Sequence, residues 1–297
     1  MRRAHETRGI RRDAISCQDP CFPAALAQTR QAPPKLYVIG GLERLERFLS
    51  QPVLAIVGTS KASAYGMETA RGLARGLAAS GVTVLSALAD GIPAAAHLGA
   101  LEVDGPTITV MPGGADVCYP ASRRRLHRRL QEIGCVVSEQ PWGRGIQRWS
   151  HLACTPILVG MAQMVIVVEA EERTAALTPA RLAQALGRTL GAVPGRVSSP
   201  VSQGPNALLA EGAHLIRGPQ DALDALYGVG VRQAPKKTVA LAPPLQDVLK
   251  QVGSGSDTLA KLVAAGHDAE QTIVALAELE VRGALVRGDG GRYLPCG

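Results

Sequence analysis

The chain has 297 residues, 46% of them hydrophobic and only 3% aromatic, with 33 glycines and a formal net charge of +7. No apolar run reaches the roughly 18 residues that a membrane span needs, and the basic start lacks the apolar segment of a secretory signal. The six cysteines are scattered without a C-x-x-C pair, which indicates reduced thiols in a cytoplasmic protein. The charge favours an anionic partner, and the shortage of aromatic rings excludes base stacking as a rich source of affinity.

Short apolar runs alternate with Ala-, Leu- and Arg-rich stretches through residues 35–226, the predicted core. The runs are apolar on both faces, as strands buried in a parallel sheet are. They lie at 35–39, 53–58, 82–86, 107–111, 135–139, 165–170 and 189–194. Between them, apolar residues recur at helical spacing over 65–80, and Gly81 ends that helix. The pattern predicts an α/β fold with a Rossmann-like, mostly parallel sheet and helices on both faces.

The ends of the chain have a different pattern. Residues 1–34 are interpreted as an irregular N-terminal arm, and the Gly- and Pro-rich residues 227–243 as a linker. Residues 244–297 predict a small C-terminal winged-helix domain, with helices near 245–252, 258–265 and 268–282 followed by a β-hairpin. The hairpin turns at Asp289-Gly290, and Asp268 caps the third helix together with Gln271.

The C-terminal domain is less basic than most DNA-reading domains. From residue 244 onward there are five Lys or Arg against seven Asp or Glu. Its third helix carries Glu270, Glu278 and Glu280, which repel phosphate. We expect this domain to contact a protein or to be autoinhibitory.

Ligands of open parallel sheets bind at the carboxyl ends of the strands. One buried strand ends in VGTSKASAYG, where small residues let backbone N–H groups approach a phosphate and a helix N-terminus attracts an anion. The predicted phosphate contacts of this turn are Gly58, Thr59, Ser60, Lys61, Ser63 and Gly66. A glycine turn of this kind also occurs for reasons of backbone geometry alone.

Two further strand ends carry small residues. Ser86 and Gly91 flank the end of the next strand, and Gly113-Gly114 predicts a second backbone nest for an anion. Three such ends close in chain order favour a shared anion-binding rim.

Arginines crowd the helix that follows the Gly113-Gly114 nest. Arg124 and Arg128, with Arg148 in a later loop, are the predicted phosphate contacts there, although such a charge run is also typical of a solvated helix face. Trp142 and Trp149 in the later loop either stack on bases or cover an edge of the core.

Several segments occur together in the order typical of one family. They are VLAIVGTSKASAYG, SALADGIPAAAHLGALE, PTITVMPGGADVCYP, VVSEQP, VIVVEAEERTAALTPARLA and GPNALLAEGAHLI. Over residues 19–226 the chain resembles the DprA/Smf family. The resemblance implies a non-enzymatic homodimer that binds and protects incoming single-stranded DNA and helps load the RecA recombinase during natural transformation. It also places a dimer face near residues 206–216.

The chain departs from the family pattern at its cationic positions. Ser60 stands where the family has an arginine after the glycine and hydroxyl residue, and Asp90 replaces another arginine. Cys154-Thr155-Pro156 replaces Arg-Asn-Arg, and Thr174-Ala175-Ala176 replaces a serine-glycine-serine segment. Each lost cation weakens phosphate binding and its dependence on salt.

Enzyme classes find little support in the sequence. Pro112-Gly113-Gly114 is similar to the turn of LOG-type nucleotide phosphoribohydrolases, but Ala115-Asp116-Val117 follows where those enzymes have Gly-Thr and a catalytic glutamate. Neither a nucleotide phosphate loop nor metal-ligand spacing is found, so no cofactor and no metal are expected. Glu139 and Glu169 at strand ends are interpreted as helix caps or partners of arginine, and His97 as a packed or capping histidine.

Three hypotheses follow. The first is a DprA-like single-stranded DNA-binding mediator of recombination. The second is a divergent Rossmann-like relative that binds a nucleotide-derived ligand at the same rim, and the third is a protein scaffold that acts through dimerisation and the acidic C-terminal domain.

Overall fold

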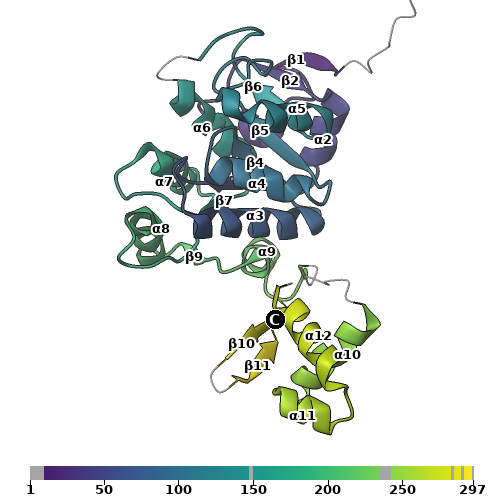
Figure 1. Ribbon diagram of the computed structural model, residues 1–297. Helices are drawn as coiled ribbons and strands as arrows, with labels where there is room; N and C mark the ends of the chain where they lie inside the picture. The colour runs from purple at the N-terminus through teal and green to yellow at the C-terminus, as the bar shows by residue number, and fades with distance from the viewer. Residues whose placement is uncertain (1–9, 147–149, 235–241, 282–283, 289–290, 296–297) are drawn as a thin grey trace, which may run out of the picture. The chain divides into compact units, whose positions relative to one another are not determined.

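A computed structural model of the chain describes residues 10–146, 150–234, 242–281, 284–288 and 291–295 (Figure 1). It divides into two compact units, residues 1–235 and 236–297. The division falls inside the predicted linker 227–243. In the described residues, no helix combines the length and apolar character that crossing a membrane requires.

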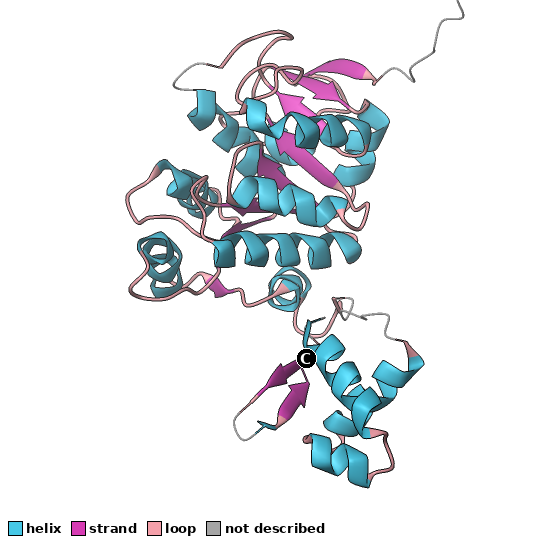
Figure 2. Cartoon of the chain, viewed as in Figure 1, coloured by secondary structure: helices cyan, strands magenta, loops and turns pink. Residues whose placement is uncertain are grey.

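The first unit is built on a nine-stranded sheet in the order β1-β2-β6-β5-β4-β3-β7-β8-β9. Figure 2 shows its strands in magenta and the surrounding helices in cyan. The strands β3 to β9 are parallel, whereas β1 and β2 pair antiparallel to their neighbours. Their bounds are Arg12–Ser16 (β1), Lys35–Ile39 (β2), Val53–Val57 (β3), Thr83–Ala87 (β4), Thr107–Val110 (β5), Cys135–Ser138 (β6), Met164–Val167 (β7), Thr189–Ala192 (β8) and His214–Leu215 (β9). The predicted mostly parallel α/β fold is confirmed.

Helices cover both faces of this sheet. They are α1 (Ala24–Ala27), α2 (Leu42–Leu49), α3 (Ala64–Ala79), α4 (Ile92–Leu101), α5 (Arg124–Glu132), α6 (Ser150–Met161), α7 (Thr178–Ala185), α8 (Pro200–Ala210) and α9 (Pro219–Tyr227). Two short 3-10 turns, Ala121–Arg123 and Ala175–Leu177, lead into α5 and α7.

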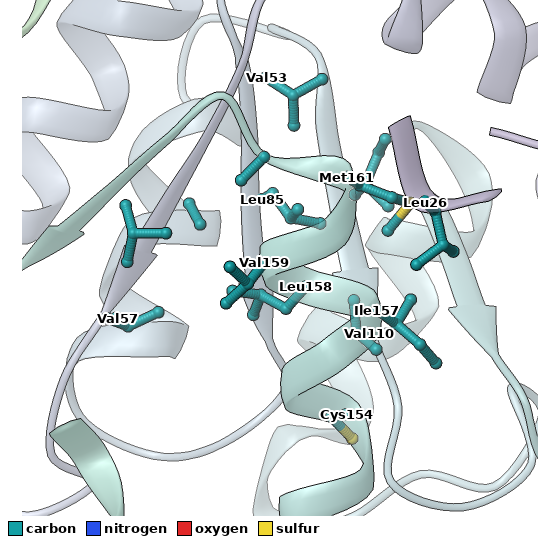
Figure 3. Close-up of a cluster of buried hydrophobic side chains, with 14 of the residues drawn as sticks. Leu26, Val53, Val57, Leu85, Val110, Cys154, Ile157, Leu158, Val159 and Met161 are labelled. Atoms are coloured by element: carbon teal, nitrogen blue, oxygen red, sulfur yellow. The ribbon is translucent and has the colours of Figure 1, made fainter. Parts of the chain in front are cut away.

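Alternate residues of the central strand β3 enter different hydrophobic clusters. Val53 and Val57 pack with Leu158 of α6, in the cluster drawn in Figure 3. Leu54 and Ile56 pack on the other face, in the cluster that contains residues of α3, α4 and α9. Side chains of a strand point to opposite faces in turn, so both faces of β3 are buried, as its unbroken apolar sequence predicts.

The predicted irregular arm, residues 1–34, is wrong for the part that the structure describes. The strand β1 pairs antiparallel with β2, from Arg12 opposite Ile39 to Ser16 opposite Lys35. Ile15 is only 3% exposed, and Phe22 and Leu26 are buried in the same cluster as β3. These apolar side chains attach the segment to the core, so the sheet begins before residue 35.

The strand order reverses beside β3. From β3 the chain adds β4, β5 and β6 on one side, then α6 returns it to form β7 on the other side. The loops that leave the carboxyl ends of β3 and β7 therefore meet at the switch point, where ligands of doubly wound sheets bind.

The second unit contains the predicted three helices and two short strands. They are α10 (Pro243–Gly253), α11 (Leu259–Ala264), α12 (Ala269–Val281), β10 (Leu285–Arg287) and β11 (Tyr293–Pro295). The predicted cap of α12 by Asp268 is confirmed, since its Oδ1 accepts a 2.9 Å hydrogen bond from the backbone N–H of Gln271. The return bond from the Gln271 side chain stays a prediction. The Asp289-Gly290 turn lies outside the described residues, and the winged-helix assignment stays a prediction.

Candidate nucleic-acid interface

The turn between β3 and α3 is held by an acid from the neighbouring strand. Glu169 follows β7, is 2% exposed, and accepts hydrogen bonds from the backbone N–H (2.8 Å) and the hydroxyl (2.5 Å) of Ser63. Ser63 in turn caps α3 by accepting the Gly66 N–H at 3.0 Å. The Thr59 N–H donates to the Glu169 carbonyl at 2.7 Å. An internal carboxylate thus occupies the helix N-terminus at which the sequence predicts a phosphate.

The glycines of this turn are explained by packing. A Cβ on Gly58 would lie 2.7 Å from the Glu169 carbonyl oxygen, and one on Gly66 would overlap the Glu169 carboxylate. Gly91 has a φ of +67° and sits against the main chain of Thr59 and Ser60. The three loops after β3, β4 and β7 therefore pack too closely for a Cβ at these positions. The glycines are thus explained by backbone geometry rather than by a phosphate site. Ser60 and Lys61 are nevertheless exposed at the tip of the turn.

The structure does not support Ser86 as a phosphate contact. Its side chain is fully buried, and its hydroxyl donates to the Ile56 carbonyl at 2.7 Å. The hydroxyl thus bonds to a main-chain carbonyl inside the sheet, where a ligand at the carboxyl edge does not reach it.

The Gly113-Gly114 segment is covered by the loop that follows β6. The Gly114 N–H donates to the Arg144 carbonyl at 2.8 Å, and a Cβ on Gly113 would lie 2.8 Å from the same oxygen. This amide is therefore not available to an external anion. In the same loop, the ring of Trp142 packs edge-on against Tyr37 with 5.1 Å between centroids and lies partly buried on the core. Trp142 covers a core edge, and Trp149 and Arg148 lie outside the described residues.

The helix α5 presents its arginines to solvent. Leu126, His127 and Leu130 form its buried face. The exposed face consists of Arg124, Arg125, Arg128 and Arg129, which we call the arginine face. Arg128 pairs with Glu132 at 3.1 Å one turn later, an exposed contact of small energetic weight. The arginine face thus carries four cations at the surface.

An ion pair ties the start of α5 to the carboxyl edge. Arg123 Nε donates to Asp90 Oδ1 at 2.6 Å, and Asp90 belongs to the loop after β4. The acidic charge of Asp90 is thus compensated by a neighbouring arginine. Because Arg124 directly follows Arg123, the arginine face begins at the edge where ligands of such sheets bind. The sequence alone does not predict this pairing, since the two residues are 33 positions apart.

The buried titratable groups of the first unit have structural roles. Burial lowers the pKa of His97 to about 4, and its ring shares hydrogen bonds with Thr107 Oγ1 (2.8 Å) and the Ala87 carbonyl (3.2 Å). This confirms a packed histidine. Burial raises the pKa of the Cys135 and Cys154 thiols to about 12, so both are unreactive at neutral pH. Among the described residues, no three or more His, Cys, Asp or Glu gather in a group that could hold a metal ion.

The doubly wound sheet, its switch point and the arginine face at its carboxyl edge define a Rossmann-like α/β protein with a basic ligand edge. The chain belongs to the DNA recombination-mediator protein A family, whose model matches residues 13–227. This confirms the resemblance to DprA/Smf proteins.

Relatives and solved structures agree with this membership. The chain is 37% identical over 244 residues to a putative DNA processing protein DprA of Mycobacterium tuberculosis, covering 80% of this chain and 62% of that protein. It is 34% identical over 288 residues to protein Smf of Escherichia coli, covering 93% and 76%. The X-ray structure of DprA from Streptococcus pneumoniae matches with a TM-score of 0.67 and 33% identity, over 71% of this chain and 73% of that one. DprA from Helicobacter pylori, whose structure is described as showing a single-stranded DNA-binding mode, matches with a TM-score of 0.63 and 28% identity, over 73% and 96%.

Proposed function

We propose that this protein binds single-stranded DNA through the arginine face of α5 and acts as a recombination mediator. The observation that carries the proposal is the set of four exposed arginines that begins at the carboxyl edge of the sheet. A guanidinium binds phosphate oxygens in a bidentate way, and it binds the backbone of any sequence. Membership in the recombination-mediator family and the described DNA binding of the Helicobacter pylori protein support the same function.

The mode of binding follows from composition and geometry. With 3% aromatic residues and Trp142 packed on the core, the chain has few rings for base stacking. Nine helical residues extend about 13 Å, so α5 offers a line of cations rather than one point charge. Affinity from phosphate contacts falls steeply with salt. We therefore expect binding that tolerates any base sequence and weakens strongly as salt rises.

The wider role is proposed on the family alone. In this proposal the protein is a cytoplasmic homodimer that protects incoming DNA and helps load RecA during natural transformation, without catalysis of its own. The packed His97 and the unreactive thiols of Cys135 and Cys154 support a non-enzymatic role. A nucleotide-derived ligand at the β3–α3 turn has less support, because Glu169 occupies the N-terminus of α3.

The second unit is proposed to contact protein rather than duplex DNA. Its helix α12 exposes the apolar side chains of Ile273 and Val274 and also the acidic side chains of Glu270 and Glu280. Acidic side chains oppose entry into a phosphate-lined groove, whereas exposed apolar side chains gain from being covered.

Oligo-dT binding measured over a range of salt concentrations tests the proposed function. The double variant Arg124→Gln/Arg128→Gln should bind about tenfold more weakly, with a log–log salt slope reduced by about 1.4, the value for two lost contacts to a single strand. The control is Arg181→Gln/Arg217→Gln, which also removes two exposed cations, each paired with an acid elsewhere in the unit. The control should bind like the unchanged protein. Equal affinities for all three proteins would contradict the assignment to α5.

A further inference from the structure

We propose that an arginine-lined pocket on the opposite, amino edge of the sheet holds a phosphate group. The pocket has a volume of about 290 Å³. It is lined by Arg11, Gly40, Gly41, Glu43, Arg44 and Arg47. Gly40 directly follows β2, and β2 runs antiparallel to β6, so the end of β2 lies beside the start of β6. The pocket is thus separate from the carboxyl edge and from the residues proposed there.

Arg44 is held in place without a carboxylate. Its Nη1 donates to the main-chain carbonyls of Glu132 (2.9 Å) and Gly134 (3.0 Å) at the end of α5. These bonds fix the guanidinium and leave its Nε and Nη2 donors outside them. A carbonyl carries no net charge, so neither bond neutralises the cation. Arg44 is therefore a preorganised positive group on the pocket wall.

The other two arginines are exposed and easily rearranged. Arg11 Nη1 lies 3.5 Å from the Glu43 carboxylate, with the two side chains 69% and 87% exposed. Such an exposed pair contributes little energy, so an entering phosphate can displace Glu43 from Arg11. Arg47 lies over the ring of Phe48, with 5.4 Å from its guanidinium carbon to the ring centroid. Three guanidinium groups against one exposed carboxylate leave the lining with a net positive charge.

The backbone shapes one wall of the pocket. Gly40 and Gly41 have φ angles of +112° and +93°, and a Cβ on Gly40 would lie 2.7 Å from the Gly134 carbonyl oxygen. This tight turn leads directly into α2, whose first-turn amides have no acceptor inside the helix. Asp13 accepts the Leu42 amide at 3.2 Å. The Asp13 carboxylate thus lies at the N-terminus of α2, so the positive charge of the pocket comes from its guanidinium groups.

The arginine face leads from the carboxyl edge to this pocket. One end of α5 is tied to the carboxyl edge through Arg123 and Asp90, and the other end accepts hydrogen bonds from Arg44. If the ligand is DNA, this inference rests on the proposed function, because single-stranded DNA that follows α5 would place a phosphodiester in the pocket. A free phosphate monoester would satisfy the same guanidinium groups. Both ligands share the phosphate oxygens that the pocket recognises.

Two variants of the full chain test the pocket with two probes, oligo-dT and the monoester 5′-dTMP. Arg11→Gln/Arg47→Gln removes two exposed cations, whereas Glu43→Gln removes the competing carboxylate. The first variant should bind about tenfold more weakly to the ligand that uses the pocket, and the second about threefold more tightly. The tighter binding cannot arise from loss of folding. Arg181→Gln/Arg217→Gln is again the matched control.

The two probes separate the pocket from the proposed function. Changes with oligo-dT identify a DNA phosphate as the ligand, and changes with 5′-dTMP alone identify a free monoester. The proposal of a phosphate pocket would be overturned if both variants bound both probes with the affinity of the unchanged protein. If the unchanged protein does not bind oligo-dT, the proposed function fails. Binding of 5′-dTMP to the two variants then still tests whether the pocket holds a phosphate.

Discussion

Two regions at the same edge of the sheet differ in where their hydrogen-bond donors and charges are directed. In the β3–α3 turn, the Ser63 amide and hydroxyl donate to the buried Glu169 carboxylate, and glycines allow the loops to pack together. The arginine face of α5 instead presents four cations to solvent. The turn has the residues of a phosphate site, but its donors are engaged inside the protein. The acceptors of the N–H groups, rather than the presence of glycine, therefore decide whether such a turn can bind an anion.

The largest expected effect comes from a substitution in the β3–α3 turn, which we call the closed region because its donors bond inside the protein. Glu169→Ala leaves the amide and hydroxyl of Ser63 without their acceptor and should lower the free energy of unfolding by about 4 kcal/mol. Urea unfolding measures the loss. Glu171→Ala, an exposed acid in the same loop, is the control and should change stability by less than about 0.5 kcal/mol. Equal stability of both variants would show that the turn does not depend on Glu169.

The next largest effect comes from His97, a buried residue of α4 that is hydrogen-bonded to Thr107 and to the Ala87 carbonyl. Because the pKa of His97 is about 4 in the folded protein, the unfolded chain binds more protons between about pH 6.5 and pH 4. Stability is therefore lost as the pH falls through this window, with a contribution of about 3 kcal/mol from this residue. Urea unfolding at a series of pH values measures it. His97→Asn should flatten the dependence, whereas substitution of the exposed His214 should leave it unchanged.

The arginine face of α5, which we call the open region, offers a smaller effect: a substitution beside it should increase the affinity for DNA. Asp90→Asn releases Arg123 from its 2.6 Å ion pair at the start of α5. One more uncompensated cation beside the arginine face should raise oligo-dT affinity about threefold at low salt and steepen the salt slope. Weaker binding by this variant would indicate that the pair instead positions the edge. Thermal unfolding of the same variant shows whether its fold is retained.

Much of the fold is predictable from the sequence because it depends on local apolar pattern. The seven buried strands follow from their uninterrupted apolar residues. The strand β1 was missed because RDAIS carries only one large apolar side chain, Ile15, as an outer strand does. The strand β9 has two residues and both are exposed, which leaves almost no pattern to detect.

The candidate site is less predictable because it depends on contacts between distant residues. Glu169 bonds to Ser63 from 106 positions away, so the closed turn cannot be inferred from the turn itself. The backbone N–H of Gly114 likewise donates to the main-chain carbonyl of Arg144, which belongs to the loop after a different strand. In contrast, the arginine face is visible in the sequence, since four arginines alternate with Leu126 and Leu130 at helical spacing.

One measurement tests most directly whether the open region, rather than the closed turn, binds DNA. The salt slope of oligo-dT binding is compared for Arg124→Gln and Lys61→Gln, two single substitutions that each remove one exposed cation. We predict that Arg124→Gln reduces the slope by about 0.7, the value for one lost contact to a single strand, and that Lys61→Gln leaves it unchanged. A reduced slope for Lys61→Gln with an unchanged slope for Arg124→Gln would contradict the account and return the site to the β3–α3 turn.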